Sequence, residues 1–154
     1  MLPPPRAAVP PVHFGGETFP LSDFSLHFPA HPAWVGVARE AMRTALAHGL
    51  PAWREIMETA VLLTSEVVSN AVIASRACRH PYPPVDLYAS WTLRGDLHVR
   101  VFDRAPGEPV TVPPPSPSPD DEHGRGLLLL AQLARRWNVH RHNPAPGKTV
   151  WFQL

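Results

Sequence analysis

The stretch SEVVSNAV, residues 65–72, lies within residues 52–79, which belong to the longest run without proline or glycine. Apolar side chains recur along this run at spacings of three and four, which predicts a long amphipathic helix. Glu66 and Asn70 stand four positions apart and therefore project from one side of that helix. Polar pairs on helices are usually solvated, but asparagine is a poor residue for a helix interior and this pair lies among valines and alanines. We therefore expect both side chains to have a partner.

Two elements are predicted ahead of this helix. Apolar and polar residues alternate over residues 24–28, which is the pattern of a short strand. Pro32 then stands at the first turn of a predicted helix over residues 34–48, and Gly49 follows its end, as expected for proline and glycine at helix termini. The side chains expected to be buried on that helix are Val35, Ala38, Met42, Ala45 and Leu46.

A hairpin is predicted after the long helix. Residues 85–93 and 97–101 each alternate between apolar and polar side chains, and a turn containing Gly95 separates them. Asp103 has the parity of the apolar residues in its strand, so its carboxylate is expected to point into the core. A buried carboxylate is costly unless it is hydrogen-bonded. Asp103 is therefore a candidate binding residue, and the alternative is an aspartate that only caps a turn.

The C-terminal part begins with a polar, proline-rich segment, residues 106–123, whose length is typical of a functional loop or of a disordered one. The tripeptide GRG, residues 124–126, then precedes a predicted apolar helix over residues 127–136. Glycines at a helix start let backbone N–H groups approach an anion, although two such glycines alone more often mark a plain turn. A second hairpin is predicted from residues 137–142 and 149–154.

The composition limits the class of function. The chain has 154 residues, of which 44% are hydrophobic and 18% charged, enough for one folded domain with a core. Its 14 Lys and Arg nearly balance its 13 Asp and Glu, which argues against direct binding to nucleic acid or to a membrane surface. Cys78 is the single cysteine, as expected in a reducing cytoplasm. Prolines crowd residues 1–20, which predicts a flexible tail ahead of a domain over residues 21–154.

Three short motifs follow one another in a fixed order along these elements. SEVVSNAV in residues 65–72, VFDRAPG in residues 101–107 and HGRGL in residues 123–127 look like the N, G1 and G2 boxes of the GHKL ATPase superfamily. That superfamily includes gyrases and histidine kinases and binds ATP in the Bergerat fold. The ending GKTVWF, residues 147–152, is similar to that of small actinobacterial members related to anti-sigma-factor serine kinases. The resemblance covers roughly residues 21–154.

The resemblance implies an α/β (α+β) two-layer sandwich, with three helices on one face of a mixed, mostly antiparallel sheet of about five strands and ATP between the layers. It implies ATP and Mg²⁺ as cofactors, with Asn70 as the Mg²⁺ ligand and Glu66 as general base on a serine hydroxyl or water. Asp103 would bind the adenine amino group, and Thr149 would make a further contact near the adenine. The other implied nucleotide contacts are Gly107, Gly124, Arg125, Gly126 and Leu127.

The implied function is that of a serine/threonine protein kinase that acts as an anti-sigma factor by partner switching. Such a protein holds a sigma factor until an antagonist protein displaces it, and it inactivates the antagonist by phosphorylation; members of this kind are often homodimers. The chain departs from the family pattern at Ala105, which replaces a glycine of the G1 box, and at Ile73 and Ala74, where an arginine and a histidine are common. The segment expected to form the ATP lid is acidic at residues 120–122. These departures keep an alternative open: a catalytically weak or inactive nucleotide-binding module that regulates transcription by docking a sigma factor, an antagonist or a DNA-binding partner.

Overall fold

A five-stranded sheet forms one layer of the molecule, with strand order β3-β4-β5-β7-β6. Every neighbouring pair in it is antiparallel, so the sheet predicted as mixed has only antiparallel neighbours among the described strands. The computed structural model describes residues 13–14, 17–18, 24–48, 51–92, 94–106 and 125–154. The strands of this sheet are β3 Phe24–Phe28, β4 Val85–Trp91, β5 Leu97–Asp103, β6 Arg136–Arg141 and β7 Lys148–Gln153.

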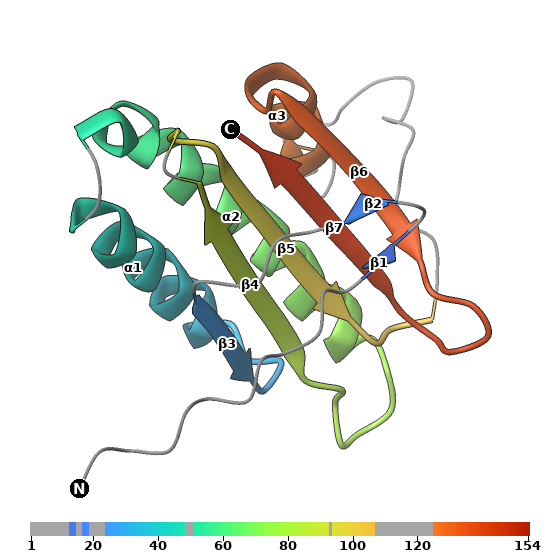
Figure 1. Cartoon of the computed structure of the whole chain (residues 1–154). Helices are drawn as coiled ribbons and strands as arrows, with labels where there is room; N and C mark the ends of the chain where they lie inside the picture. The colour runs from blue at the N-terminus through green and yellow to red at the C-terminus, as the bar shows by residue number, and fades with distance from the viewer. Residues whose placement is uncertain (1–12, 15–16, 19–23, 49–50, 93, 107–124) are drawn as a thin grey trace, which may run out of the picture.

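Helices form the second layer, and Figure 1 shows α1 and α2 side by side behind the strands. The helix α2 contacts α1, α3 and the strands β4 and β5, so it lies at the centre of this layer. The predicted two-layer sandwich is confirmed. Two helices are shorter than predicted, since α2 ends at Arg76 and α3 ends before the chain enters β6 at Arg136. The helix bounds are α1 Ala33–Ala47, α2 Pro51–Arg76 and α3 Arg125–Leu133.

The hydrophobic core lies between the two layers. The register places Val85, Asp103 and Lys148 in one row across β4, β5 and β7. The next two rows on the same face of these strands hold only buried apolar side chains: Leu87, Val101 and Val150, then Ala89, Val99 and Phe152. Asp103 is only 1% exposed, so its predicted inward direction is confirmed. Of the side chains predicted to be buried on α1, three are buried (Ala38, Met42 and Leu46) and two are half-buried (Val35 and Ala45).

The segment Trp53–Arg76 of α2 is long and apolar enough to cross a membrane. In this fold it is the central core helix, because Ala60, Leu63 and Val68 on it are fully buried against the rest of the domain. Core helices of water-soluble domains satisfy the same criterion, so the segment is weak evidence for a membrane span.

A small second sheet lies near the N-terminus. Its strands β1, His13–Phe14, and β2, Glu17–Thr18, pair in antiparallel fashion. These residues fall within the predicted tail, where no strands were expected; the rest of residues 1–20 lies outside the described part of the chain.

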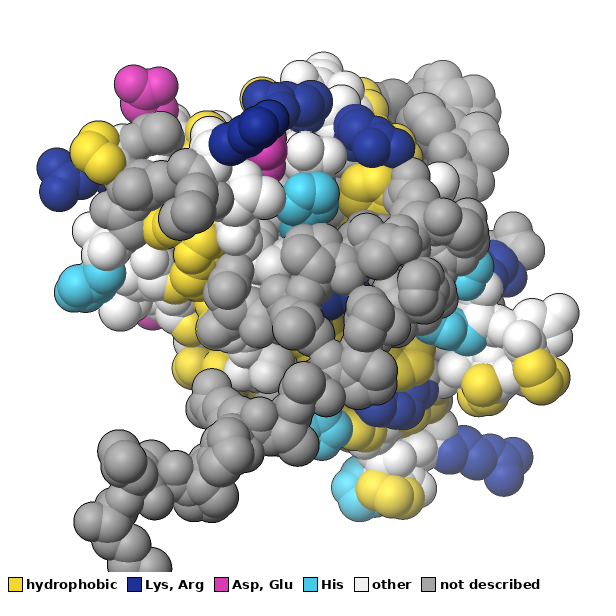
Figure 2. Space-filling model, in the orientation of Figure 1, with side chains coloured by type: hydrophobic (Ala, Val, Ile, Leu, Met, Phe, Trp, Pro, Cys, Tyr) yellow, Lys and Arg dark blue, Asp and Glu magenta, His cyan; other side chains and the backbone are white. Residues whose placement is uncertain are grey.

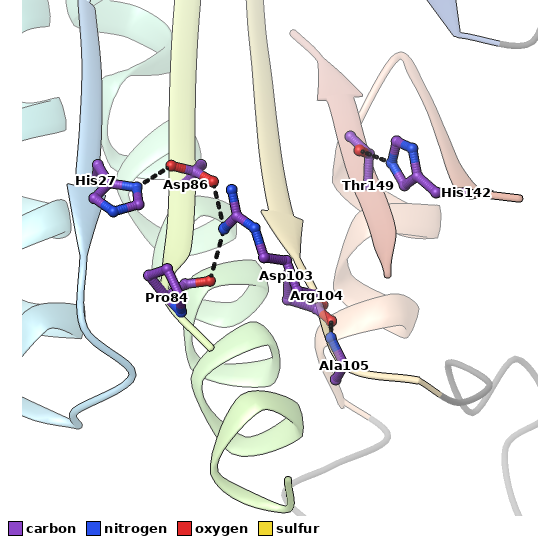
Figure 3. Close-up of polar contacts among 8 residues, drawn as sticks. All are labelled: His27, Pro84, Asp86, Asp103, Arg104, Ala105, His142 and Thr149. Carbon is purple, nitrogen blue, oxygen red and sulfur yellow. Dashed lines mark hydrogen bonds and ion pairs between the residues drawn. The ribbon is translucent and has the colours of Figure 1, made fainter. Parts of the chain in front are cut away.

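The sheet face turned away from the helices carries polar and charged side chains. Figure 2 shows Lys and Arg side chains at separate places around this face, with histidine and apolar side chains between them. On this face Asp86 of β4 is 5% exposed and binds two neighbours from other strands, His27 of β3 and Arg104 just after β5 (Figure 3). Arg104 Nη1 lies 2.8 Å from the Asp86 carboxylate and donates to the Pro84 carbonyl at 3.1 Å. The network ties the edge strand β3 to the middle of the sheet.

Replacing Asp86 by asparagine is expected to lower the free energy of unfolding by about 1–3 kcal/mol, because two charge-assisted contacts of a buried carboxylate are lost together. Urea denaturation followed by circular dichroism measures this. Glu58→Gln is the matched control, since Glu58 meets Arg43 at 3.5 Å with 75% of its side chain exposed, and exposed pairs contribute little. Equal effects of the two substitutions would contradict a structural role for the Asp86 network.

Candidate functional site

The predicted polar pair of α2 lies against the first turn of α3. Gly126 is buried, and a Cβ built on it would lie 2.8 Å from Asn70 Nδ2, 3.4 Å from Glu66 Cβ and 3.5 Å from Glu66 Oε2. Such a Cβ would collide with the asparagine amide. The glycine therefore allows the backbone at the start of α3 to approach both predicted site residues, so the segments that resemble the N box and the G2 box meet in space.

The start of α3 has the properties of an anion site. The first N–H groups of a helix have no partner within the helix, and the helix dipole places partial positive charge there. Leu127 is half-buried and packs against the core, while Leu130 is fully buried, so these two side chains fix the helix in place. Arg125 is exposed at the first position of the helix. The predicted Gly124 lies outside the described residues, as does the predicted Gly107.

Asp103 ends β5 and is held by two partners. Lys148 Nζ lies 2.8 Å from its Oδ2, and the backbone N–H of Ala105 donates to its Oδ1 at 3.1 Å. Burial raises the pKa of Asp103 above its ordinary value, and the bonds from Lys148 and Ala105 oppose that rise. The predicted carboxylate is therefore in place at the end of its strand, but it is already paired with a cation.

Gly147 and Lys148 were not among the predicted site residues. Gly147 has φ +120°, and a Cβ on it would lie 2.4 Å from the carbonyl oxygen of Asp103. Its carbonyl accepts a hydrogen bond from the N–H of His142 at 3.0 Å, which closes the last hairpin. This close approach sets Lys148 opposite Asp103 in the register. The signal that could have found Lys148 is its parity with the apolar residues of its own strand.

Thr149 does not join Asp103. The register pairs Thr149 with Phe102, so its side chain lies on the sheet face turned away from the helices. There it shares a 2.9 Å hydrogen bond with His142 Nε2 (Figure 3). Burial lowers the pKa of His142, which favours the neutral ring in this contact. The structure thus separates Thr149 from Asp103, the other predicted adenine contact, and Lys148 occupies the inward position of β7 beside Asp103.

A comparison with protein-family models identifies the family of this chain. The family model described as the histidine kinase-like ATPase domain matches residues 28–154. Among solved structures, the chain is similar to the histidine kinase domain of the Erythrobacter litoralis EL346 blue-light activated histidine kinase, with 23% identity and a TM-score of 0.49. The match covers 82% of this chain and 60% of that one. No curated protein matches. Because the family model spans most of the chain, the protein belongs to the histidine kinase-like ATPase domain family of the GHKL superfamily.

Proposed function

We propose that the protein binds ATP with Mg²⁺ and transfers the γ-phosphoryl group to a serine or threonine hydroxyl of a partner protein. The observation that supports this most directly is the contact of Gly126 with Asn70 and Glu66. It gathers a side-chain amide, a carboxylate and a helix start within one small space. Those are the groups that a magnesium–phosphate complex and its proton acceptor require.

The residues present fit a Mg²⁺–nucleotide complex. The absence of a Cβ at Gly126 lets the backbone at the start of α3 lie close against the amide of Asn70. In the proposal, the Asn70 amide oxygen is the protein ligand of Mg²⁺, an ion that prefers oxygen ligands and retains waters and phosphate oxygens. When bound, the ion would neutralise charge on the phosphates during transfer. Asp103 would accept a hydrogen bond from the adenine amine.

Glu66 is the proposed general base. Its carboxylate would take the proton of the attacking hydroxyl, whose oxygen forms a new bond to the γ-phosphorus. The bond between the γ-phosphorus and the oxygen that bridges it to the β-phosphorus breaks, and ADP leaves with that oxygen. The glutamate stands one helical turn before Asn70, so the proton acceptor and the proposed metal ligand share one side of α2.

The proposed role in the cell is that of a cytoplasmic anti-sigma factor acting by partner switching. The C-terminal GKTVWF ending and the three ordered motifs resemble those of the anti-sigma-factor serine kinases. In this role a sigma factor, an antagonist or a DNA-binding regulator would dock on the domain, and the antagonist would be the phosphoryl acceptor. A homodimer would be compatible with the same role.

A second candidate is a nucleotide-binding module with little or no transfer activity. The observation that favours it is the environment of Ala105 and Ile73. Ala105, at a glycine position of the family pattern, is buried, and Ile73, where a basic residue is common, leaves 44% of its surface exposed. Neither side chain can hold a phosphate. Binding without turnover would select this candidate over the kinase.

Replacing Asn70 by alanine is expected to remove the strengthening of ATP binding by Mg²⁺, a loss of about tenfold or more in affinity. Calorimetric titration with ATP and with ADP, each with and without Mg²⁺, measures this. Ser69→Ala is the matched control, because Ser69 is the half-buried neighbour on the same helix and has no assigned role. An equal loss of affinity in the absence of Mg²⁺ would contradict the role of Asn70 as metal ligand, and no binding by the unaltered protein would overturn the proposed function.

A further inference from the structure

Lys148 is the only lysine of the chain, which otherwise carries its positive charge on arginine. It is also buried, at 7% exposure, on the helix-facing side of the sheet. Lysine is rarely buried, and a buried ion pair is on average no more stabilising than apolar side chains of the same size. Fold stability alone therefore gives little reason for a lysine here, and the reason is better sought in binding.

The pair presents two complementary groups side by side. The Lys148 ammonium lies 2.8 Å from Asp103 Oδ2, while Oδ1 of the same carboxylate is bound by the Ala105 N–H at 3.1 Å. An ammonium has three N–H donors, and each carboxylate oxygen has two lone pairs. After their mutual contact, the pair therefore retains both donor and acceptor capacity. Gly147 sets the placement, because only a residue without a Cβ lets the start of β7 approach the Asp103 carbonyl so closely.

We propose that Lys148 is a base-recognition residue: its ammonium donates a hydrogen bond to ring nitrogen N1 of adenine, while Asp103 accepts one from the adjacent exocyclic amine. This inference rests on the proposed ATP site. The adenine edge presents a donor and an acceptor next to each other, which matches an adjacent carboxylate and ammonium. Guanine in the same pose presents its carbonyl oxygen to the carboxylate and an N–H to the ammonium, and both contacts are repulsive.

The side-chain type fits this task. An ammonium is a compact donor that can point at a single ring nitrogen and at a carboxylate together. An arginine fork would bind the Asp103 carboxylate through two parallel bonds and leave the base without a directed donor. The lysine thus supplies a base contact from the strand that carries Thr149, one residue before it and on the opposite face of the sheet.

The test compares ATP with 1-deaza-ATP, in which a carbon replaces N1, by calorimetric titration of the intact chain. The unaltered protein is expected to bind ATP about 10- to 100-fold more tightly than 1-deaza-ATP, as a hydrogen bond to a charged group predicts. In Lys148→Met the ratio of the affinities for ATP and 1-deaza-ATP is expected to fall to near one. The variant Lys148→Arg keeps the positive charge but moves the hydrogen-bond donor. GTP is expected to bind more weakly than either adenine nucleotide.

The outcomes separate the two proposals. Equal binding of ATP and 1-deaza-ATP by the unaltered protein would overturn the role of Lys148 and leave the ATP site intact. Binding of GTP as tightly as ATP would overturn it as well. No binding of any nucleotide would overturn the proposed function and this inference with it. A lysine that only supports the fold would lower the affinity for both adenine nucleotides equally in Lys148→Met, so the ratio distinguishes recognition from stability. Because the comparison on the unaltered protein needs no substitution, the test holds even if a variant fails to fold.

Discussion

Replacing Gly147 by alanine is expected to lower the free energy of unfolding by about 2–5 kcal/mol. Two effects combine. At φ +120° an L-residue is strained, and the added Cβ would lie 2.4 Å from the Asp103 carbonyl oxygen and 3.0 Å from the Cα of Arg104. Both of these atoms belong to the backbone of β5 and its exit, so they cannot rotate away. Relief requires the start of β7 to move off β5, which also separates Lys148 from Asp103.

Gly36→Ala is the control for this prediction. Gly36 lies in the first turn of α1, and a Cβ there would come no closer than 3.8 Å to another residue, at the flexible end of Arg39. Alanine in a helix is favoured over glycine by roughly 0.5–1 kcal/mol, so this substitution should stabilise the protein slightly. Urea denaturation of both variants gives the comparison. Similar unfolding midpoints for the two variants would contradict the packing of Gly147 against β5.

The elements with a clear period were predictable because their burial follows from local pattern. The hairpin of β4 and β5 alternates between apolar and polar residues as far as Val101, and extending this parity by two residues was enough to place Asp103 in the core. The same parity argument applied to β7 would have placed Lys148 beside it. The resemblance to the family motif pointed to Thr149 instead, whose side chain lies on the opposite face of the sheet. A motif specifies residue types in order, whereas the side of the sheet follows from strict alternation along the strand.

Features that depend on distant partners were harder to predict. The end of α3 carries neither glycine nor proline, and Arg136 enters β6 because it pairs with Gln153 of β7, a partner that lies outside any local window. The contact of Gly126 with Asn70 joins segments far apart in the chain. Composition and spacing could identify Gly126 and Asn70 as candidate site residues, but their contact follows only from the fold. The pairing of β1 with β2 had a local signal that was overlooked, the dipeptide Gly-Gly at residues 15–16 between the two strands.

Replacing Glu66 by glutamine is expected to lower phosphoryl transfer by about 10²- to 10⁴-fold while ATP binding stays within a few-fold of the unaltered protein. Glutamine has nearly the shape of glutamate, so the packing of this side chain against Gly126 is retained. It cannot accept the proton of the attacking hydroxyl, so only the chemical step is affected. Production of ADP from ATP and Mg²⁺, with water as acceptor, measures the rate without a known protein substrate, and calorimetry measures the binding.

Glu55→Gln is the control, because Glu55 is exposed on the same helix and has no assigned role. It should leave both the rate and the affinity unchanged. If Glu66→Gln retains the full rate, Glu66 is not the base. If it loses ATP binding together with the rate, the carboxylate holds the nucleotide complex rather than the proton. If the unaltered protein binds ATP with Mg²⁺ but releases no ADP, the helix pair of Glu66 and Asn70 serves binding alone, and the regulatory module without turnover becomes the better account of this fold.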